Sequence, residues 1–481
     1  MSKQKNKTYK KSKNKHNRSE KPYEKQNSSQ RVKKSVTAEV TCSGLTNEGK
    51  GIAQWKGKQL EVPHLLPGEK AEVTVFQKGR FVNAELKRVI NPAKERVEPP
   101  CAYYYECGGC QLQHMSNQTQ SRLKQQTIDG LMKPFGKPEP ILTMDDPYNY
   151  RNKSHTTFGL NHKRQIIGGL YAQNTHEITP VDWCLIHDPK ADEIVQTIKD
   201  YMKTSKMQPY NEDTGRGFLR HVLIKVGKVS EEIMVVLVAA SSEFKGKKNF
   251  VKALRKAHPE ITTMLLNVNK RDTSVVLGDQ EYVLFGKGTI TDTLCGLKFE
   301  ISAKSFYQIN PVQTEKLYGK AIEMAELTGE ETVIDAYCGI GTIGLVASQK
   351  AGKVIGVEVN KDAVRDAIRN SKRNGVKNAR FYQGDAGEFM IEMAKRGDKA
   401  DVVIMDPPRS GSDEAFLSSV VQLQPKRIVY VSCNPETQVR DLKYLEKNGY
   451  DVEGIQPVDM FPQTMHVEAV TKLVLKEGTG S

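Results

Sequence analysis

Hydrophobic and polar residues along the last third of the chain follow a pattern that predicts strands and helices in turn. Short apolar runs, such as 332–338 and 353–359, are each followed by a longer amphipathic segment with helical periodicity. Regular alternation of this kind predicts a parallel doubly wound sheet. The other expected strands are 379–383, 401–405 and 427–433, and the expected helices are 342–350, 361–374, 386–396, 413–421 and 436–447. Two closing strands, 450–458 and 468–475, are expected to form an antiparallel edge.

The first two thirds of the chain have a different texture. From Ser35 to about residue 93, short alternating segments are separated by glycines, which predicts a small closed β-barrel. A mixed region follows, with strands expected at 221–227, 232–240 and 274–278 and helices at 191–203 and 248–257. The predicted architecture is multidomain α/β, made of a basic tail (1–34), an OB-like β-barrel (35–93), a central α+β domain (94–303) and a C-terminal Rossmann-like domain (304–481).

Candidate binding groups stand where the predicted parallel strands end. Gly339-Ile340-Gly341-Thr342-Ile343-Gly344 fits the G-x-G-x-x-G pattern between a strand and a helix, although a lone match is weak. Glu358 ends the next strand, where a carboxylate can bind ribose hydroxyls, and Asp385 follows the third strand. Asp406-Pro407-Pro408-Arg409 follows the fourth. Doubly wound sheets bind ligands at this edge. The acid-Pro-Pro signature resembles that of S-adenosylmethionine (SAM)-dependent methyltransferases rather than that of dehydrogenases.

A cysteine and a carboxylate extend this set. Cys433 lies in Ser432-Cys433-Asn434-Pro435, between the fifth strand and the next helix. The N-terminus of that helix is expected to lower the thiol pKa. Glu468 enters the final strand and could act as a base. Taken alone, such a residue is more often a solvated charge, and His466 a surface histidine or one with its hydrogen bonds satisfied. Cys338, in the glycine-rich loop, is interpreted as a packing residue.

Together these motifs resemble the RNA uridine C5-methyltransferase family, from Ser35 to the end of the chain. The resemblance rests on Ser-Cys-Asn-Pro, Asp-Pro-Pro-Arg, the run Phe306-Tyr307-Gln308-Ile309-Asn310, the loop from Asp335 to Gly341, and the Phe461-Pro462…His466-Val467-Glu468 ending. It implies that SAM is the methyl donor and that its contacts are Gln308, Tyr337, Glu358, Asp406 and Asp385.

The resemblance also implies a mechanism. Cys433 would add to carbon 6 of uracil, carbon 5 would take the methyl group, and Glu468 would remove the proton from carbon 5. The target base would first be turned out of its stack. RNA methyltransferases that act on cytidine carry a cysteine beside the proline of the strand-four loop. Asp406 stands in that loop here, which favours uridine.

Four upstream cysteines suggest a metal site. Cys101, Cys107 and Cys110 are closely spaced, and Cys184 follows far downstream. Spacing alone permits zinc, with His114 or His187 as a substitute ligand, or an iron–sulfur cluster. The family resemblance implies a [4Fe-4S] cluster held by the four cysteines, as in the branch that methylates 23S ribosomal RNA (rRNA).

The barrel at 35–93 resembles the RNA-binding TRAM domain, which together with the cluster favours an rRNA substrate. Methylation of the T-loop of transfer RNA (tRNA) is one alternative. A catalytically idle RNA-binding or ribosome-assembly factor is another, and the intact set of Cys433, Asp406 and Glu468 argues against it.

The net charge of the chain indicates which kind of partner it binds. The chain carries 72 Lys and Arg against 57 Asp and Glu, a formal charge of +15. Residues 1–35 account for +11 of it, which leaves +4 for the remaining 446 residues. A basic, apolar-poor tail of this kind is interpreted as a phosphate-binding arm, with a solubilising tail as the alternative.

Apolar runs and cysteine content exclude several classes of protein. The longest apolar run, 233–240, is far shorter than the ~20 residues that a membrane helix needs. The N-terminus lacks the apolar stretch of a secretory signal, and the eight cysteines do not suggest a disulfide scaffold. The expected location is cytoplasmic, with RNA as partner, no membrane association and no obligate protein partner evident.

Overall fold

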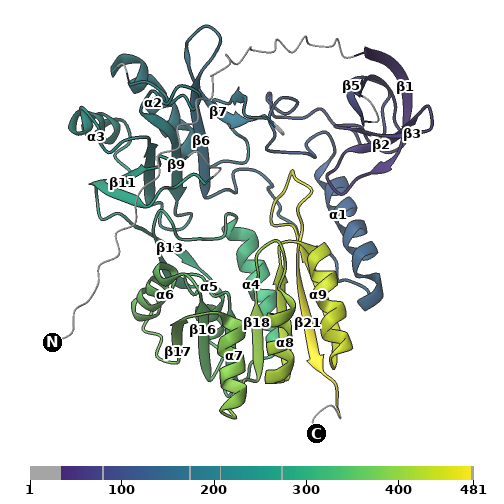
Figure 1. The fold of residues 1–481 in the computed structure, drawn as a ribbon, viewed down its shortest axis with the longest axis vertical. Coiled ribbons are helices and arrows are strands. Elements are labelled where there is room, and N and C mark those ends of the chain that lie inside the picture. The colour runs from purple at the N-terminus through teal and green to yellow at the C-terminus, as the bar shows by residue number, and fades with distance from the viewer. Residues whose placement is uncertain (1–33, 79–80, 173–174, 206, 272–274, 478–481) are drawn as a thin grey trace, which may run out of the picture.

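The computed structural model describes residues 34–78, 81–172, 175–205, 207–271 and 275–477. They form three bodies, with a barrel and a central sheet above a C-terminal sheet in the view of Figure 1. The predicted basic tail lies outside the described residues except for Lys34. No helix in the described ranges is long and apolar enough to cross a membrane.

The N-terminal body is a five-stranded antiparallel sheet in the order β3-β2-β1-β4-β5. Its strands are β1 (Lys34–Leu45), β2 (Gly51–Trp55), β3 (Lys58–Val62), β4 (Lys70–Lys78) and β5 (Phe81–Asn91). Strand β3 also lies against β5, which closes the sheet into a barrel. Val40, Ala53, Leu60 and Val73 alternate with polar residues along the strands and fill its interior.

The central body is a seven-stranded mixed sheet in the order β12-β11-β10-β9-β6-β7-β8. Its strands are β6 (Lys153–Leu160), β7 (Ile166–Tyr171), β8 (Ile178–Pro180), β9 (Leu219–Val226), β10 (Ile233–Ala239), β11 (Ile261–Val268) and β12 (Gln280–Phe285). Helices α2 (Pro189–Ser205) and α3 (Lys247–Ala257) pack on one face through apolar residues such as Ile194 and Phe250.

The expected strand at 274–278 is wrong, because residues 275–278 form no strand. Side chains of β11 and the loop after it bind the backbone of this segment instead. Asn267 donates to the carbonyl of Gly278 (3.0 Å) and accepts from its N–H (2.7 Å). Asn269 donates to the carbonyls of Val275 and Val276. These bonds satisfy polar groups that a strand would have paired with a neighbour.

The C-terminal sheet has the order β17-β16-β15-β18-β19-β21-β20. The parallel strands β15 (Thr332–Ala336), β16 (Lys353–Glu358), β17 (Ala379–Gln383), β18 (Val402–Met405) and β19 (Arg427–Ser432) adjoin an antiparallel pair, β21 (Glu468–Leu475) and β20 (Tyr450–Val458). The predicted doubly wound sheet with an antiparallel edge is confirmed. Its helices are α4 (Pro311–Ala325), α5 (Thr342–Ala347), α6 (Lys361–Arg373), α7 (Ala386–Lys395), α8 (Glu414–Leu423) and α9 (Pro435–Lys447).

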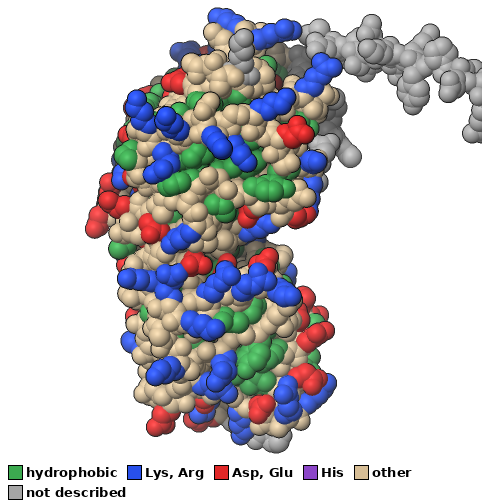
Figure 2. Space-filling view, turned by 90° about the vertical axis from the view of Figure 1, so that its left-hand side faces the viewer, with side chains coloured by type: hydrophobic (Ala, Val, Ile, Leu, Met, Phe, Trp, Pro, Cys, Tyr) green, Lys and Arg blue, Asp and Glu red, His purple; other side chains and the backbone are tan. Residues whose placement is uncertain are grey.

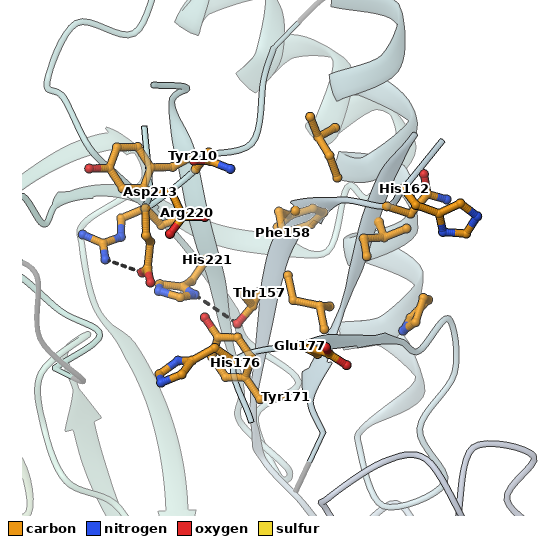
Figure 3. Close-up of a pocket in the computed structure, with 18 residues that line it drawn as sticks. Thr157, Phe158, His162, Tyr171, His176, Glu177, Tyr210, Asp213, Arg220 and His221 are labelled. Atoms are coloured by element: carbon orange, nitrogen blue, oxygen red, sulfur yellow. Dashed lines mark hydrogen bonds and ion pairs between the residues drawn. The ribbon is translucent and has the colours of Figure 1, made fainter. Parts of the chain in front are cut away.

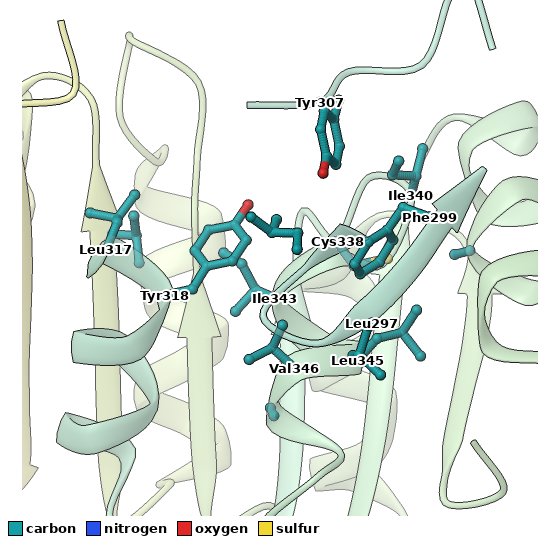
Figure 4. Close-up of a cluster of buried hydrophobic side chains, with 14 of the residues drawn as sticks. Leu297, Phe299, Tyr307, Leu317, Tyr318, Cys338, Ile340, Ile343, Leu345 and Val346 are labelled. Atoms are coloured by element: carbon teal, nitrogen blue, oxygen red, sulfur yellow. The ribbon is translucent and has the colours of Figure 1, made fainter. Parts of the chain in front are cut away.

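Successive residues of each strand point to opposite faces of the C-terminal sheet and pack into two separate hydrophobic cores. In β19, Val429 and Val431 pack with α4, α5 and α6, whereas Ile428 and Tyr430 pack with α7, α8 and α9. The first core contains Cys338, which is 5% exposed among the side chains of Figure 4. The interpretation of Cys338 as a packing residue is therefore confirmed.

Two further pieces connect the bodies. Helix α1 (Asn117–Met132), followed by the short 3-10 turn η1 (Lys133–Phe135), packs against α9 and contributes Ile128 and Met132 to the second core. The hairpin β13 (Ile290–Leu294) and β14 (Leu297–Ile301) lies between the central sheet and the C-terminal sheet. The segment after the barrel thus packs on a helical face of the C-terminal sheet, beside α9 (Figure 1).

Candidate active site

Strand register places the predicted nucleophile opposite the predicted base. Strands β19 and β21 are antiparallel, and Ser432 pairs with Ala469. Cys433 directly follows the last residue of β19, and Glu468 directly precedes Ala469, so continuing the register places Cys433 opposite Glu468. Asp406 follows β18, the strand on the other side of β19. Three groups that are remote in sequence are thus gathered at one edge of the sheet.

Burial and mutual repulsion hold these groups toward their neutral forms. Glu468 is 3% exposed, and its burial together with the charge of Asp406 raises its pKa to about 8. Burial raises the pKa of Asp406 to about 7. Burial, followed by the charges of Glu468 and Asp406, raises the pKa of the Cys433 thiol to about 11. In the absence of a ligand the site therefore disfavours accumulation of negative charge.

The expected lowering of the Cys433 pKa by the helix N-terminus is wrong, because burial and the neighbouring carboxyl groups raise it. The first residue of α9 is Pro435, which has no N–H. The side chain of Asn434 caps the helix by accepting from the N–H of Glu436 (3.3 Å). Burial, which is the largest cause, and the charges of Glu468 and Asp406 then outweigh the favourable charge of Arg409.

Arg409 forms a contact that the sequence did not reveal. Its Nη2 donates to Nδ1 of His466 over 2.8 Å, so His466 accepts with that nitrogen. Burial and the charge of Arg409 lower the pKa of His466 and keep it neutral. The carbonyl of Arg409 also accepts from Asn434 Nδ2 (3.0 Å) and Thr437 Oγ1 (3.2 Å). These bonds fasten the Asp-Pro-Pro-Arg loop to the loop of Cys433.

Helix α1 fixes the segment that leads into Glu468. Lys124 is buried, and its Nζ donates to Asp459 Oδ1 over 2.6 Å and to the carbonyl of Phe461 over 3.2 Å. Gln120 donates to Gln463 Oε1 over 2.9 Å, and its Oε1 accepts from the N–H of Gln463. The position of Glu468 therefore depends on residues about 340 positions earlier in the chain.

Cys433 opens into a cavity of about 270 Å³. Its walls come from three parts of the chain: the β1–β2 loop of the barrel through Asn47, α1 through Lys124 and Thr127, and the C-terminal body through Arg409 and His466. Asn47 also donates to Glu436 on α9, which ties the barrel to the rim of this cavity. Basic and hydrogen-bonding groups around a thiol suit an anionic substrate with a polar ring.

Four of the five residues expected to bind SAM, all except Gln308, stand at the carboxyl ends of parallel strands at the same edge of the sheet. Glu358 accepts from the N–H groups of Gly339 (3.1 Å) and Asn360 (2.8 Å). Its carboxylate thereby bridges the ends of the first two strands. The ring of Tyr337 lies 4.9 Å from that of Phe416, and its hydroxyl lies 3.4 Å from Ser412 Oγ. These contacts fix Tyr337 in a backbone conformation with φ 63°.

The other two expected contacts have local structural roles as well. Asp385 caps α7, since its Oδ1 accepts from the N–H of Glu388 over 3.0 Å. Gln308 is 7% exposed, and its carbonyl accepts from Asn152 Nδ2 over 2.8 Å. Asn152 precedes β6, so the central body positions the Gln308 segment.

The glycine-rich loop is shaped by contacts that leave no room for side chains. A Cβ at Gly344 would lie 2.6 Å from Asp335 Oδ2, which accepts from the Gly344 N–H over 2.8 Å. A Cβ at Gly341 would lie 2.9 Å from the ring of Phe381, and Gly341 has φ 81°. Burial of Asp335 raises its pKa to about 8.

The four upstream cysteines lie within electrostatic range of one another. Burial is the main cause of the raised pKa values of Cys101, Cys107 and Cys110, and the charge of Cys184 raises each of them further. Burial is also the largest single cause at Cys184 and acts to raise its pKa, but the hydrogen bond to His187, the charge of His187 and a backbone hydrogen bond from Ile186 together lower the pKa of Cys184. Within the described ranges, no group of three or more His, Cys, Asp or Glu side chains is arranged to hold a metal ion.

A larger cavity, of about 740 Å³, lies on the central sheet and is shown in Figure 3. In this cavity His221 Nδ1 lies 3.2 Å from Thr157 Oγ1, and Arg220 Nη2 donates to Glu212 Oε1 over 2.8 Å. Its described lining includes none of the predicted catalytic, SAM-binding or cysteine residues. The chemistry indicated by the sequence therefore belongs to the smaller cavity at Cys433.

Comparison with known proteins agrees with this geometry. Residues 116–476 match the sequence profile of the family described as tRNA (Uracil-5-)-methyltransferase. An uncharacterized RNA methyltransferase of Halalkalibacterium halodurans is 43% identical over 452 residues, which cover 92% of this chain and 98% of that protein. One of Listeria innocua is 42% identical over 452 residues, with 92% and 99% covered.

A solved structure resembles almost the whole chain. The tRNA (uracil-54, C5)-methyltransferase of Pyrococcus abyssi, in complex with S-adenosyl-L-homocysteine, has a TM-score of 0.74 and 27% identity. The likeness covers 91% of this chain and 99% of that protein. The chain therefore belongs to the RNA uracil-5-methyltransferase family and is a SAM-dependent RNA methyltransferase.

Proposed function

We propose that the protein forms 5-methyluridine in RNA through a covalent bond between Cys433 and the target uracil, with Glu468 as the base. The observation that carries this proposal is the register of β19 and β21, which sets the thiol opposite a buried carboxyl group. A nucleophile and a base on facing strands can act on adjacent carbons of one ring.

The chemistry follows from the weak nucleophilicity of carbon 5 of uracil. Cys433 loses its thiol proton to solvent, and Sγ forms a bond to carbon 6 as the electrons of the 5,6 double bond move toward the carbonyl at carbon 4. Carbon 5 of the resulting enolate takes the methyl group, whose bond to the donor sulfur breaks so that S-adenosyl-L-homocysteine is the leaving group. Glu468 then removes the proton from carbon 5, the double bond re-forms, and the bond between Sγ and carbon 6 breaks.

SAM, when bound by Gln308, Tyr337, Glu358, Asp385 and Asp406, supplies the methyl group and the positive charge of its sulfonium. A positive charge bound there would offset the charges of Glu468 and Asp406, which together with burial raise the pKa of Cys433. Arg409 contributes in the same direction, since its charge already lowers the pKa of Cys433.

We favour 23S rRNA as the substrate, with the barrel acting as a TRAM-like RNA-binding module. Asn47 of the barrel reaches the rim of the Cys433 cavity, so RNA held by the barrel would lie beside the active site. The tRNA T-loop is the second candidate. It is favoured by the Pyrococcus abyssi tRNA enzyme, whose likeness covers 91% of this chain. Because the likeness to this tRNA enzyme extends over nearly the whole chain, the domain organisation of the chain does not argue against a tRNA substrate.

We further propose that Cys101, Cys107, Cys110 and Cys184 hold a [4Fe-4S] cluster with a structural or RNA-positioning role, because methyl transfer itself needs no electron. Four mutually interacting thiols are a suitable donor set. A cluster of four irons also holds its thiolates farther apart than a single zinc ion does. Protein purified without oxygen should therefore be brown and contain about four irons; bound zinc without iron would contradict the cluster.

The substrate is tested by nucleoside mass spectrometry on rRNA and tRNA, purified separately from cells with and without the gene. Loss of 5-methyluridine from 23S rRNA, restored by wild type but not by Cys433→Ala, is the expected result. Loss from tRNA alone would move the activity to the T-loop. If 5-methyluridine is unchanged in both, the protein is an RNA-binding factor without this activity.

A further inference from the structure

We propose that α3 and the neighbouring strand β12 form a second RNA-binding surface, which binds the phosphates of a single-stranded segment outside the active site. The inference rests on the proposed RNA substrate and extends it to a part of the central body with no role in methyl transfer. This surface is called the α3 surface below. It consists of the outward residues of α3 and the exposed side of β12.

Helix α3 is strongly one-sided. Phe250 and Leu254 are buried against the central sheet. The exposed side carries five cations within ten residues: Lys247, Lys248, Lys252, Arg255 and Lys256. Among the described residues, none of the five has a carboxylate within ion-pair distance, whereas cations of α6 pair with Glu300, Asp362 and Asp366.

The lack of acidic partners matters because the rest of the folded chain is nearly neutral. Outside residues 1–35 the net charge is only +4, so five unpaired cations on one helix are a local excess. Figure 2 shows the face that carries α3, with Lys and Arg side chains gathered around hydrophobic patches on its upper part. A concentrated positive field of this kind favours a polyanion.

A groove between α3 and β12 distinguishes this surface from a merely solvated helix face. It encloses about 590 Å³ and combines apolar lining from Val251, Val283 and Leu284 with the cations of α3. Of these lining residues, Val283 on the edge strand β12 is 54% exposed. Cationic rims along an apolar groove match a single strand of RNA, which presents phosphates on one side and bases on the other.

Arg255 adds a platform for a base. Its Cζ lies 3.9 Å from the centroid of the Phe285 ring, so the guanidinium is stacked on that ring. Arg255 is nevertheless exposed, and the opposite face of the guanidinium therefore meets solvent. Unpaired bases of RNA stack on such planes. Tyr282, which is 46% exposed on β12, offers a second aromatic surface.

The test compares binding of two RNAs, a uridine-containing hairpin with and without a single-stranded extension, at increasing salt. The variant is Lys248→Gln/Lys252→Gln/Arg255→Gln in the full chain. Each lost phosphate contact lowers the salt slope by about 0.7 for single strands, so the slope for the extended RNA should fall by about 2. The hairpin alone should be bound almost as by wild type, and the effect on methylation should appear in KM for the extended RNA rather than in kcat.

A matched control removes the same charge elsewhere. Lys350, Lys353 and Lys377 are exposed at the opposite end of the C-terminal sheet from the active site, and their triple Gln variant should keep the slope of wild type. The variant Lys248→Arg/Lys252→Arg should also keep it, which separates charge from folding.

An unchanged slope in the α3 variant, an equal fall in the control, or binding of anionic phospholipid vesicles in place of the extension would overturn the inference. If the protein formed no 5-methyluridine but the α3 variant still had a lower salt slope than wild type for the extended RNA, only the proposed function would be overturned.

Discussion

The electrostatics of Cys433 give a prediction that does not depend on the RNA substrate. Burial and two neighbouring carboxyl groups raise its pKa to about 11, against an ordinary value of 9.0. Two pKa units correspond to about 100-fold less thiolate at pH 8. Since alkylation proceeds through the thiolate, Cys433 in the ligand-free protein should react about 100-fold more slowly than an unperturbed cysteine.

Two variants should change the rate of Cys433 alkylation in opposite directions. Glu468→Gln removes a charge that raises the thiol pKa, so alkylation of Cys433 should accelerate above pH 8, where Glu468 of wild type is ionised. Arg409→Gln removes the charge that lowers the pKa and should slow the reaction. The burial of Cys433 is the largest cause, so neither variant should restore the rate of a free thiol.

The assay is iodoacetamide labelling from pH 7 to 10, read by mass spectrometry of the peptide that contains Cys433. A cysteine-containing peptide in the same tube provides the unperturbed reference. If Cys433 is labelled as fast as the reference at pH 8, or if Glu468→Gln leaves the pH profile unchanged, the electrostatic description of the site is wrong.

Three further predictions concern stability and cofactor binding. Glu468 titrates near 4.5 when unfolded and at about 8 when folded, so its contribution to stability is complete below pH 4.5 and is lost as the pH rises to 8. Glu468→Gln should therefore stabilise the protein more at pH 8.5 than at pH 5, by up to a few kcal/mol of unfolding free energy, and its rise in Tm should be larger at pH 8.5. An equal rise in Tm at the two pH values contradicts this. Lys124→Ala should cost about 3–5 kcal/mol in denaturant unfolding, because it leaves Asp459 buried without its partner, and Lys124→Ala with Asp459→Asn should recover part of the loss. Gly344→Ala should weaken SAM binding in calorimetry, because its Cβ would lie 2.6 Å from Asp335 Oδ2; unchanged affinity would show that the loop relaxes freely.

The C-terminal sheet could be predicted from the sequence because each of its strands is short, apolar and followed by an amphipathic helix. The strand ends then located Asp406 and Cys433 without any tertiary information. Helix α4 was not predicted from the sequence. In the structure it lies beside α5, where the hydroxyl of Tyr318 is 3.0 Å from Thr342 Oγ1. Its first turn depends on a tertiary contact, in which Asn310 both caps the helix and donates to the carbonyl of Met460.

Long-range contacts account for what the sequence could not predict at the site. The position of Glu468 relies on Lys124 and Gln120, which belong to α1, and no local pattern links the two segments. The pKa of Cys433 depends on the carboxyl groups that the fold places beside it, whereas the local motif pointed to a helix N-terminus. The contact between Arg409 and His466 joins two motifs that were each visible separately.

Trapping the covalent intermediate tests the central claim most directly. RNA that contains 5-fluorouridine at the target position has no proton at carbon 5 for Glu468 to remove, so the adduct should persist after methyl transfer. With SAM present, wild type should give an RNA-linked band in denaturing gels and a crosslinked peptide that contains Cys433, whereas Cys433→Ala should give neither. Absence of an adduct from an otherwise active wild-type protein, or an equal adduct with Cys433→Ala, would contradict the account.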